Sequence, residues 1–255
     1  MRQFQLRLLE ILKVLDRVCR EHSLSYYIEA GTLLGAVRHG GFIPWDDDID
    51  VIMPRPDYDR LMSHADEWLP SPMKLMTGQN TAHYHHAFAK VVDTSTRLVE
   101  RNLEMGLYVD VFPIDGMSGG ALVQRLHVLR FRYVTKKLLY FCCRDPYKHG
   151  RGVGSWLPLL CQKFYGYERA QRAIDRMQRR YDYAAHDLTI DHDFYRRGIM
   201  PKSVLGKPTE ILFEGCRFFG PEHPEEYLGR VYGADYMTPP PPEKRQVHYF
   251  SEVRF

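Results

Sequence analysis

The stretch from Tyr26 to Met53, YYIEAGTLLGAVRHGGFIPWDDDIDVIM, decides the fold and gathers the polar side chains best suited to chemistry. Residues 26–30 are a short aromatic and apolar run, which predicts a buried strand. Gly31 and Thr32 interrupt this run, and residues 33–38 predict a helix whose first turn Thr32 can cap. Gly31 would let a phosphate approach the backbone, where the helix N-terminus offers free N–H groups. The segment therefore predicts a strand, turn and helix that suit a bound phosphate.

Four acidic residues follow within five positions, and they lead into an apolar run over residues 49–53. They are Asp46, Asp47, Asp48 and Asp50. Because residues i and i+2 of a strand share a face, Asp48 and Asp50 are expected to project together. Two adjacent carboxylates repel each other unless a cation or a proton lies between them, and oxygen ligands suit Mg²⁺ or Mn²⁺. The pattern predicts a metal site, and the alternative is an acidic turn that caps a strand.

The segments GTLLGAVRH at 31–39 and FIPWDDDIDV at 42–51 resemble the signature of LicD-family phosphotransferases, whose eukaryotic relatives are the fukutin-type transferases. The resemblance implies a nucleotidyltransferase fold, an α/β mixed sheet flanked by helices. It implies transfer of a phosphoryl-linked alcohol, such as phosphocholine or a polyol phosphate, from a CDP-activated donor to a sugar hydroxyl. The sequence departs from the family pattern at Asp47, where a hydrophobic residue is expected. That departure leaves Asp46 as a candidate additional or alternative ligand.

The composition is that of an ordinary globular protein of 255 residues, with 44% hydrophobic and 26% charged residues. Its net charge of +3 predicts no general affinity for nucleic acid. We expect no signal peptide and no membrane span, because charged residues interrupt every apolar run. Five cysteines without a Cys-x-x-Cys spacing favour a reducing compartment. We therefore expect a cytoplasmic protein.

Two later segments predict strands that carry charged residues. Residues 88–92 and 97–100 are typical of a hairpin that turns through 93–96. Lys90 would lie in its first arm between apolar neighbours, facing a nucleotide phosphate or a solvated sheet surface. Asp110 is flanked by two valines, so we expect it to meet Asp48 and Asp50, as the third acid of the nucleotidyltransferase pattern does. The alternative places Asp110 at an edge in water, and we assign Asp115 to the following turn.

Residues 121–140 predict a long helix with an apolar stripe formed by Leu122, Leu126, Leu129 and Tyr133. Basic residues crowd this part of the chain with the single acid Asp145 between them: Arg125, Arg130, Arg132, Lys136, Lys137, Arg144, Lys148 and Arg151. This charge indicates either a docking surface for an anionic membrane or acceptor, or a solvated helix face. Residues 210–213 and 217–219 predict a second hairpin, and residues 225–232 predict a short helix. Like the family, the chain ends in a basic segment with a histidine, here Arg245 and His248.

We divide the chain into a catalytic core at 1–120, a basic helical lobe at 121–209 and a C-terminal segment at 210–255 that returns to the core. The expected reaction needs Mg²⁺ or Mn²⁺, with a CDP-alcohol as donor and a cell-surface glycan (lipopolysaccharide, teichoic acid or capsule) as acceptor. Asp48 and Asp50 would hold the metal, and Asp110 would complete the site as general base. Gly31 and Thr32 would bind phosphate, while Arg38 and Lys90 would offset the charge of the leaving nucleotide. One alternative is a nucleotidyltransferase that attaches a whole nucleotide, and another is a scaffold without catalysis.

Overall fold

The fold is a mixed sheet with helices on both faces, as the sequence predicted. The computed structural model describes residues 1–100, 103–147, 152–245 and 252–254. The sheet runs in the order β1 (Tyr27–Ile28), β2 (Asp50–Pro54), β5 (Leu103–Met117), β4 (Ala89–Glu100) and β10 (Glu252–Arg254). β3 (Met73–Met76) pairs with β4, and β6 (Leu188–Asp191) pairs with both β5 and β7 (Ile199–Pro201). Only β2 and β5 run parallel to each other among these pairs.

The prediction of a hairpin over residues 88–100 is wrong. β4 is one strand that pairs with β5 on both sides of an irregularity between Asp93 and Leu98. The Asp-Thr-Ser-Thr sequence supplies turn chemistry to this irregularity: the Asp93 carboxylate accepts hydrogen bonds from the backbone N–H and the hydroxyl of Ser95. The prediction that Asp115 belongs to the turn after the strand is also wrong, because Asp115 lies within β5 and is buried.

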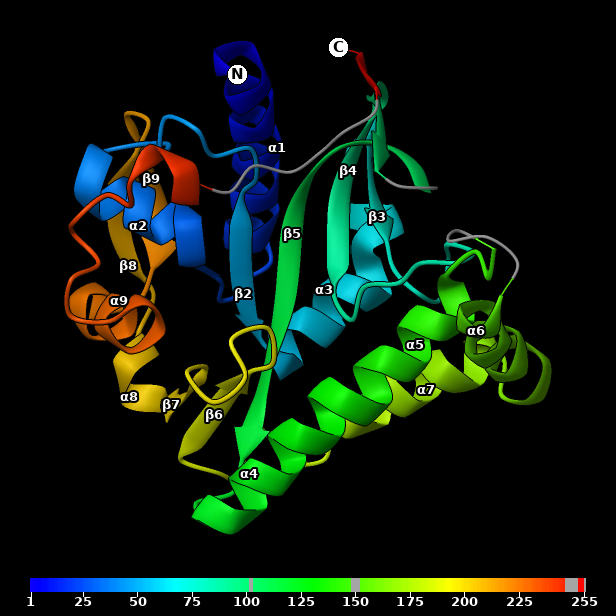
Figure 1. Cartoon of the computed structure of the whole chain (residues 1–255). Coiled ribbons are helices and arrows are strands. Elements are labelled where there is room, and N and C mark those ends of the chain that lie inside the picture. The colour runs from blue at the N-terminus through cyan, green and yellow to red at the C-terminus, as the bar shows by residue number, and fades with distance from the viewer. Residues whose placement is uncertain (101–102, 148–151, 246–251, 255) are drawn as a thin grey trace.

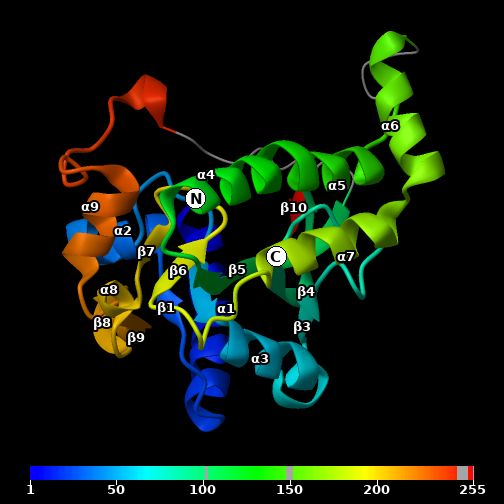
Figure 2. The same ribbon diagram turned by 90° about the horizontal axis from the view of Figure 1, so that it is seen from below.

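The helices cover the two faces of the sheet (Figure 2). α1 (Arg2–Glu21) and α3 (Arg55–Trp68) lie on one side, and α4 (Ala121–Arg130), α5 (Lys136–Cys143) and α7 (Tyr167–Gln178) lie on the other. α1 buries Leu8, Ile11, Leu12 and Leu15, which recur at helical spacing, in the main core. α6 (Val153–Phe164) extends beyond the rest of this layer (Figure 2). The described helices include none that is long and apolar enough to cross a bilayer.

The long helix predicted over 121–140 is present and extends to Cys143. A π-helical turn at Phe131–Thr135 joins α4 to α5 without a break, because the residues on both sides of it keep helical backbone angles. π-turns frequently occur at functional sites, since the extra residue re-aims neighbouring side chains. Here the turn points Phe131, Arg132 and Tyr133 at a cavity described below.

A smaller group of elements packs against α2 (Ala30–His39) at one end of the sheet (Figure 1). It contains α8 (Lys202–Leu205), the strands β8 (Thr209–Phe213) and β9 (Cys216–Gly220), α9 (Pro224–Tyr232) and the 3₁₀ turn Pro242–Lys244. β8 and β9 form the second predicted hairpin, and positive φ angles at Glu214 and Gly215 close its turn. α9 begins one residue before the predicted helix. These elements fix the position of α2, and therefore of the acidic stretch that follows it.

Candidate active site

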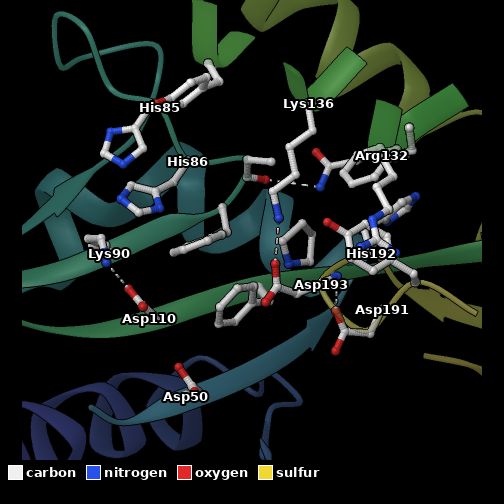
Figure 3. Close-up of a pocket in the computed structure, with 18 of the residues that line it drawn as sticks. Asp50, His85, His86, Lys90, Asp110, Arg132, Lys136, Asp191, His192 and Asp193 are labelled. Carbon is white, nitrogen blue, oxygen red and sulfur yellow. Dashed lines mark hydrogen bonds and ion pairs between the residues drawn. The ribbon is translucent and has the colours of Figure 1, made fainter. Parts of the chain in front are cut away.

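The candidate site is a cavity of about 730 Å³ between the sheet and the layer that contains the α4–α5 helix (Figure 3). Its floor is formed by β2, β4 and β5, and its opposite wall by the π-turn and α5. Asp191 at the end of β6 and the loop that follows it to Tyr195 close one side. The cavity contains Asp48, Asp50, Lys90 and Asp110, so the chain brings together four of the charged residues that the sequence predicted around the phosphates.

Three of these residues lie at one level across adjacent strands. Asp50 on β2 is in register with Asp110 on β5, and Asp110 is in register with Lys90 on β4. The register follows from the parallel pairing of β2 with β5 and the antiparallel pairing of β4 with β5. Asp110 is buried rather than placed at an edge in water, which excludes the alternative considered for it.

Lys90 is 1% exposed, and its ammonium lies 2.5 Å from the Asp110 Oδ1 atom. The Lys90 Nζ atom also lies 3.4 Å from the centre of the Tyr108 ring, in the geometry of a cation–π contact. Lys90 is therefore not on a solvated sheet surface. Lys90 and Asp110 therefore form a buried ion pair in the floor of the cavity.

The acidic loop is held against the start of α2. The N–H of Asp50 donates a hydrogen bond of 2.9 Å to the Thr32 hydroxyl oxygen. Thr32 therefore positions the start of β2 and does not cap the helix, whose N-cap is Glu29. At Gly31, a Cβ atom would lie 2.8 Å from the Asp46 Oδ2 atom. The absence of a side chain at Gly31 therefore lets the Asp46 carboxylate approach the N-terminus of α2, where the helix dipole favours a negative charge.

The electrostatics of Asp50 indicate a site built for a counter-charge. Burial raises the pKa of Asp50 well above its ordinary range, and the carboxylates of Asp48, Asp110 and Asp46 raise it further. A cation or a proton at this position would relieve that repulsion. Asp48 precedes β2 by two residues and lines the same cavity as Asp50.

The donor set suits a metal that is completed by substrate. Among the residues that the structure describes, no group of three His, Cys, Asp or Glu side chains is close enough to hold a metal ion. Asp110 is paired with Lys90 instead of closing such a group. Asp48 and Asp50 fit the common Mg²⁺ arrangement, in which one or two carboxylates hold the ion and substrate phosphates and waters supply the other ligands.

The opposite wall is basic. Arg132, Lys136 and Lys137 line it, and Lys136 reaches down to an ion pair of 2.9 Å with Asp193 (Figure 3). His85 and His86, from the loop before β4, lie at the rim. This places an acidic floor opposite a basic wall within one cavity, an arrangement that can hold a metal on one side and phosphate oxygens on the other.

Comparison with known proteins identifies the family to which the chain belongs. Residues 23–136 match the family model "LicD/FKTN/FKRP, nucleotidyltransferase domain". The chain is 28% identical to the lipopolysaccharide cholinephosphotransferase LicD of Haemophilus influenzae over 99% of its own length and 97% of that protein. The chain is a member of the LicD family. Uncharacterized proteins of Rickettsia prowazekii and Rickettsia typhi are each 48% identical to it over 46 residues, or 18% of the chain.

Membership of the LicD family confirms the resemblance seen in residues 31–51, but four residues predicted to bind substrate are not among those that line the cavity. They are Gly31, Thr32, Arg38 and Arg245. Arg38 donates a hydrogen bond of 2.9 Å to the Tyr236 carbonyl and joins α2 to the segment after α9. Arg245 stacks on the Trp45 ring at 4.0 Å, next to the acidic loop. His248 falls outside the described residues. Arg38, Arg245 and His248 stay predictions as substrate-binding residues.

Sequence reasoning missed a buried carboxyl pair beside this LicD-family site. Glu29 is 1% exposed and accepts a hydrogen bond of 2.7 Å from the Tyr227 hydroxyl, and its carboxyl group lies close enough to that of Asp191 for each to affect the pKa of the other. Burial raises the pKa of Glu29 well above its ordinary range, and the charges of Asp191 and Asp50 raise it further. Burial also raises the pKa of Asp191, to about 6. The sequence could have indicated Glu29 as a site residue, because it is a carboxylate within the apolar run 26–30. No local pattern indicates Asp191 in the same way.

Proposed function

We propose that this chain transfers a phosphoryl-alcohol group, phosphocholine first of all, from a CDP-activated donor to a hydroxyl of a lipopolysaccharide-like glycan. One observation carries the proposal: Asp48, Asp50 and Asp110 face Arg132, Lys136 and Lys137 across a single cavity. The similarity to a lipopolysaccharide cholinephosphotransferase over nearly the whole chain supports phosphocholine as the first group to test.

The reaction replaces the phosphoanhydride bond of the donor with a phosphodiester bond to the acceptor. The acceptor hydroxyl oxygen bonds to the phosphorus that carries the alcohol, while the bond from that phosphorus to the CMP oxygen breaks and CMP leaves. Asp48 and Asp50 would hold Mg²⁺ or Mn²⁺, which neutralises charge on the donor phosphates when it is bound. Lys90 adds fixed positive charge to the floor of the cavity, and the lysines and arginine of the opposite wall orient phosphate oxygens.

Asp110 is the candidate general base for the acceptor proton. It lies in register with Asp50 at the cavity floor, and its side chain is fixed by the ion pair with Lys90. A base in this position has its rotamer set before the acceptor arrives, which is a condition for efficient proton transfer. Asp110→Asn keeps the shape and an oxygen ligand but cannot accept a proton. It should lower kcat by roughly 10²-fold or more, with a smaller effect on donor affinity.

The aromatic lining of the cavity favours a quaternary ammonium alcohol over an uncharged polyol. Phe88 and Phe112 line the cavity with ring centres 4.0 Å apart. Aromatic faces attract a choline-type cation, and they give no comparable gain to glycerol or ribitol.

A donor screen tests this proposal directly. CDP-choline, CDP-glycerol and CDP-ribitol would each be incubated with the protein, Mg²⁺ and a hydroxyl-bearing glycan. We expect CMP release and transfer of the alcohol phosphate, fastest with CDP-choline. Pyrophosphate released from a nucleoside triphosphate, without CMP from any of the three donors, would favour the nucleotidyltransferase alternative. The absence of both reactions, with nucleotide binding also lacking, would favour the scaffold.

A further inference from the structure

Large apolar side chains are exposed along the α4–α5 helix and along α6. Figure 2 shows the course of these two helices. On the α4–α5 helix they begin at Leu122, which is 69% exposed, and on α6 they include Trp156 at 64% and Phe164 at 68%. We call these residues the apolar helix surface. Its members are Leu122, Val123, Leu126, Leu129, Tyr133, Val134, Tyr140, Val153, Trp156, Leu157, Leu160 and Phe164.

The spacing of these side chains shows that they form faces of helices and are not scattered. On α6 they recur at positions 153, 156, 157, 160 and 164, which is one side of a helix. On α4 the exposed apolar residues at positions 122, 126 and 129 also lie on one side of the helix, and Tyr133 in the π-turn extends this row. The stripe predicted from the sequence therefore faces outward.

The fold does not need this face for its own core. The opposite side of the α4–α5 helix buries Phe131, Leu139 and Cys142 against Ala170 and Ile174 of α7. Monomeric proteins rarely leave apolar helix faces of this kind in water, unless these faces bind a partner or a membrane.

The charge around the apolar helix surface indicates what would cover it. Arg125, Arg130 and Lys137 are exposed on the same helix, and within the described part of the chain none of them forms an ion pair. Asp145 is the only acidic residue between 121 and 166. Basic side chains that flank leucine, tryptophan and phenylalanine are typical of helices that lie in the interface of an anionic bilayer.

We propose that the apolar helix surface docks the protein on an anionic lipid bilayer, with α6 and the α4–α5 helix lying in the membrane interface. The cavity is continuous with this surface, because Tyr133, Lys137 and Tyr140 are exposed on the helix and also line the cavity. Docking therefore places the mouth of the cavity at the membrane. This inference goes beyond the proposed reaction and does not depend on it, since binding can be measured without any substrate.

Sedimentation of the full chain with lipid vesicles tests the proposal. The two vesicle types are phosphatidylcholine alone and phosphatidylcholine mixed with phosphatidylglycerol. We expect binding to the mixed vesicles that falls as salt rises, because salt screens the basic residues. Trp156→Gln with Leu160→Gln should weaken the partition coefficient about tenfold or more, because the apolar anchor is lost. The matched control, Leu212→Gln with Met237→Gln, changes two exposed apolar residues outside the surface and should bind as the wild type does.

A second pair of variants separates charge from apolar contact. Arg125→Gln with Arg130→Gln should weaken binding to the mixed vesicles, and the same loss of charge at Arg17 and Lys74, which are exposed elsewhere, should not. Equal binding to both vesicle types, no binding to either, or equal effects of the surface and control variants would overturn the proposal. A dimer detected by analytical ultracentrifugation, dissociated by Trp156→Gln with Leu160→Gln, would assign the surface to a second copy of the chain instead.

Discussion

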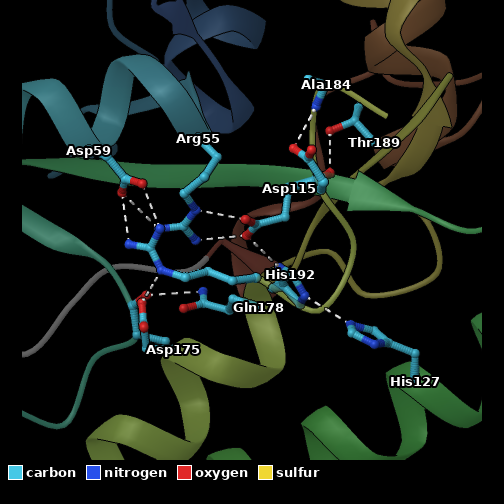
Figure 4. Close-up of polar contacts among 12 residues, drawn as sticks. Arg55, Asp59, Asp115, His127, Asp175, Gln178, Ala184, Thr189 and His192 are labelled. Carbon is cyan, nitrogen blue, oxygen red and sulfur yellow. Dashed lines mark hydrogen bonds and ion pairs between the residues drawn. The ribbon is translucent and has the colours of Figure 1, made fainter. Parts of the chain in front are cut away.

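Removing the carboxylate of Asp115 should destabilise the protein more than removing any exposed acid. The Asp115 side chain is 1% exposed, and its two oxygens each accept a hydrogen bond of 2.7 Å from the Arg55 guanidinium (Figure 4). Arg55 begins α3 directly after β2, whereas Asp115 lies on β5. The pair therefore joins the two parallel strands whose register places Asp50 beside Asp110.

The expected loss of stability depends on which partners Arg55 would still have without the Asp115 carboxylate. Burial alone would lower the pKa of Arg55, but the hydrogen bonds and charge of Asp115 outweigh it and raise that pKa. Without Asp115, the nearest carboxylate oxygen is on Asp59 at 3.7 Å, and Arg179 already binds that carboxylate. A buried charge without its partner typically costs about 3–5 kcal/mol. We expect Asp115→Asn to lower the free energy of unfolding by about 3 kcal/mol, because asparagine keeps one acceptor.

Urea unfolding followed by tryptophan fluorescence measures this loss. Asp59→Asn is the control, since its carboxylate is 40% exposed and its ion pairs should contribute about 1 kcal/mol or less. Replacing both partners, Arg55→Met with Asp115→Leu, should cost less than Asp115→Asn alone, because no uncompensated charge stays buried. A loss below about 1 kcal/mol for Asp115→Asn, equal to that of the control, would refute the reasoning.

Three further predictions concern the cavity. Asp50→Asn should raise the thermal midpoint at pH 8, because it removes a buried carboxylate whose pKa is raised by burial and by neighbouring acids; a lower midpoint would contradict this. Lys90→Met should lower turnover by about 10²-fold or more through loss of the buried ammonium, and near-normal turnover would exclude that role. The wild type should lose stability as pH rises through the interval from about 4 to about 6, because Asp191, with a pKa of about 6 against 3.8, holds a proton when folded that it releases when unfolded. Glu29→Gln should make this loss smaller in urea unfolding at pH 5 and pH 8, because the pKa of Glu29 is itself raised by burial and glutamine does not titrate; an unchanged loss would show that Glu29 does not contribute to it.

Much of the site could be predicted because its parts are close in sequence or carry a local conflict. Asp48 and Asp50 stand in one contiguous segment with the turn and helix that position them. Lys90 and Asp110 each interrupt an apolar strand, and a charge in such a place needs a partner. In the structure Lys90 on β4 and Asp110 on β5 are each other's partner in an ion pair.

The rest depended on contacts between distant segments. Asp191 reaches the site only because β6 pairs with the end of β5, and nothing in residues 188–191 indicates that pairing. Residues 93–96 carry ordinary turn chemistry that the structure uses within a strand. Helical periodicity also identified the stripe that begins at Leu122 without showing which way it faces, because a second apolar face on the same helix fills the core.

The most direct test of the central claim is CMP release from CDP-choline in the presence of Mg²⁺ and a glycan acceptor, measured side by side for the wild type, Asp50→Asn and the control Asp59→Asn. The account predicts that the wild type and the control release CMP and transfer phosphocholine, while Asp50→Asn is slower by about 10²-fold or more. Equal rates for all three proteins, with the same dependence on Mg²⁺, would contradict the assignment of the reaction to this cavity.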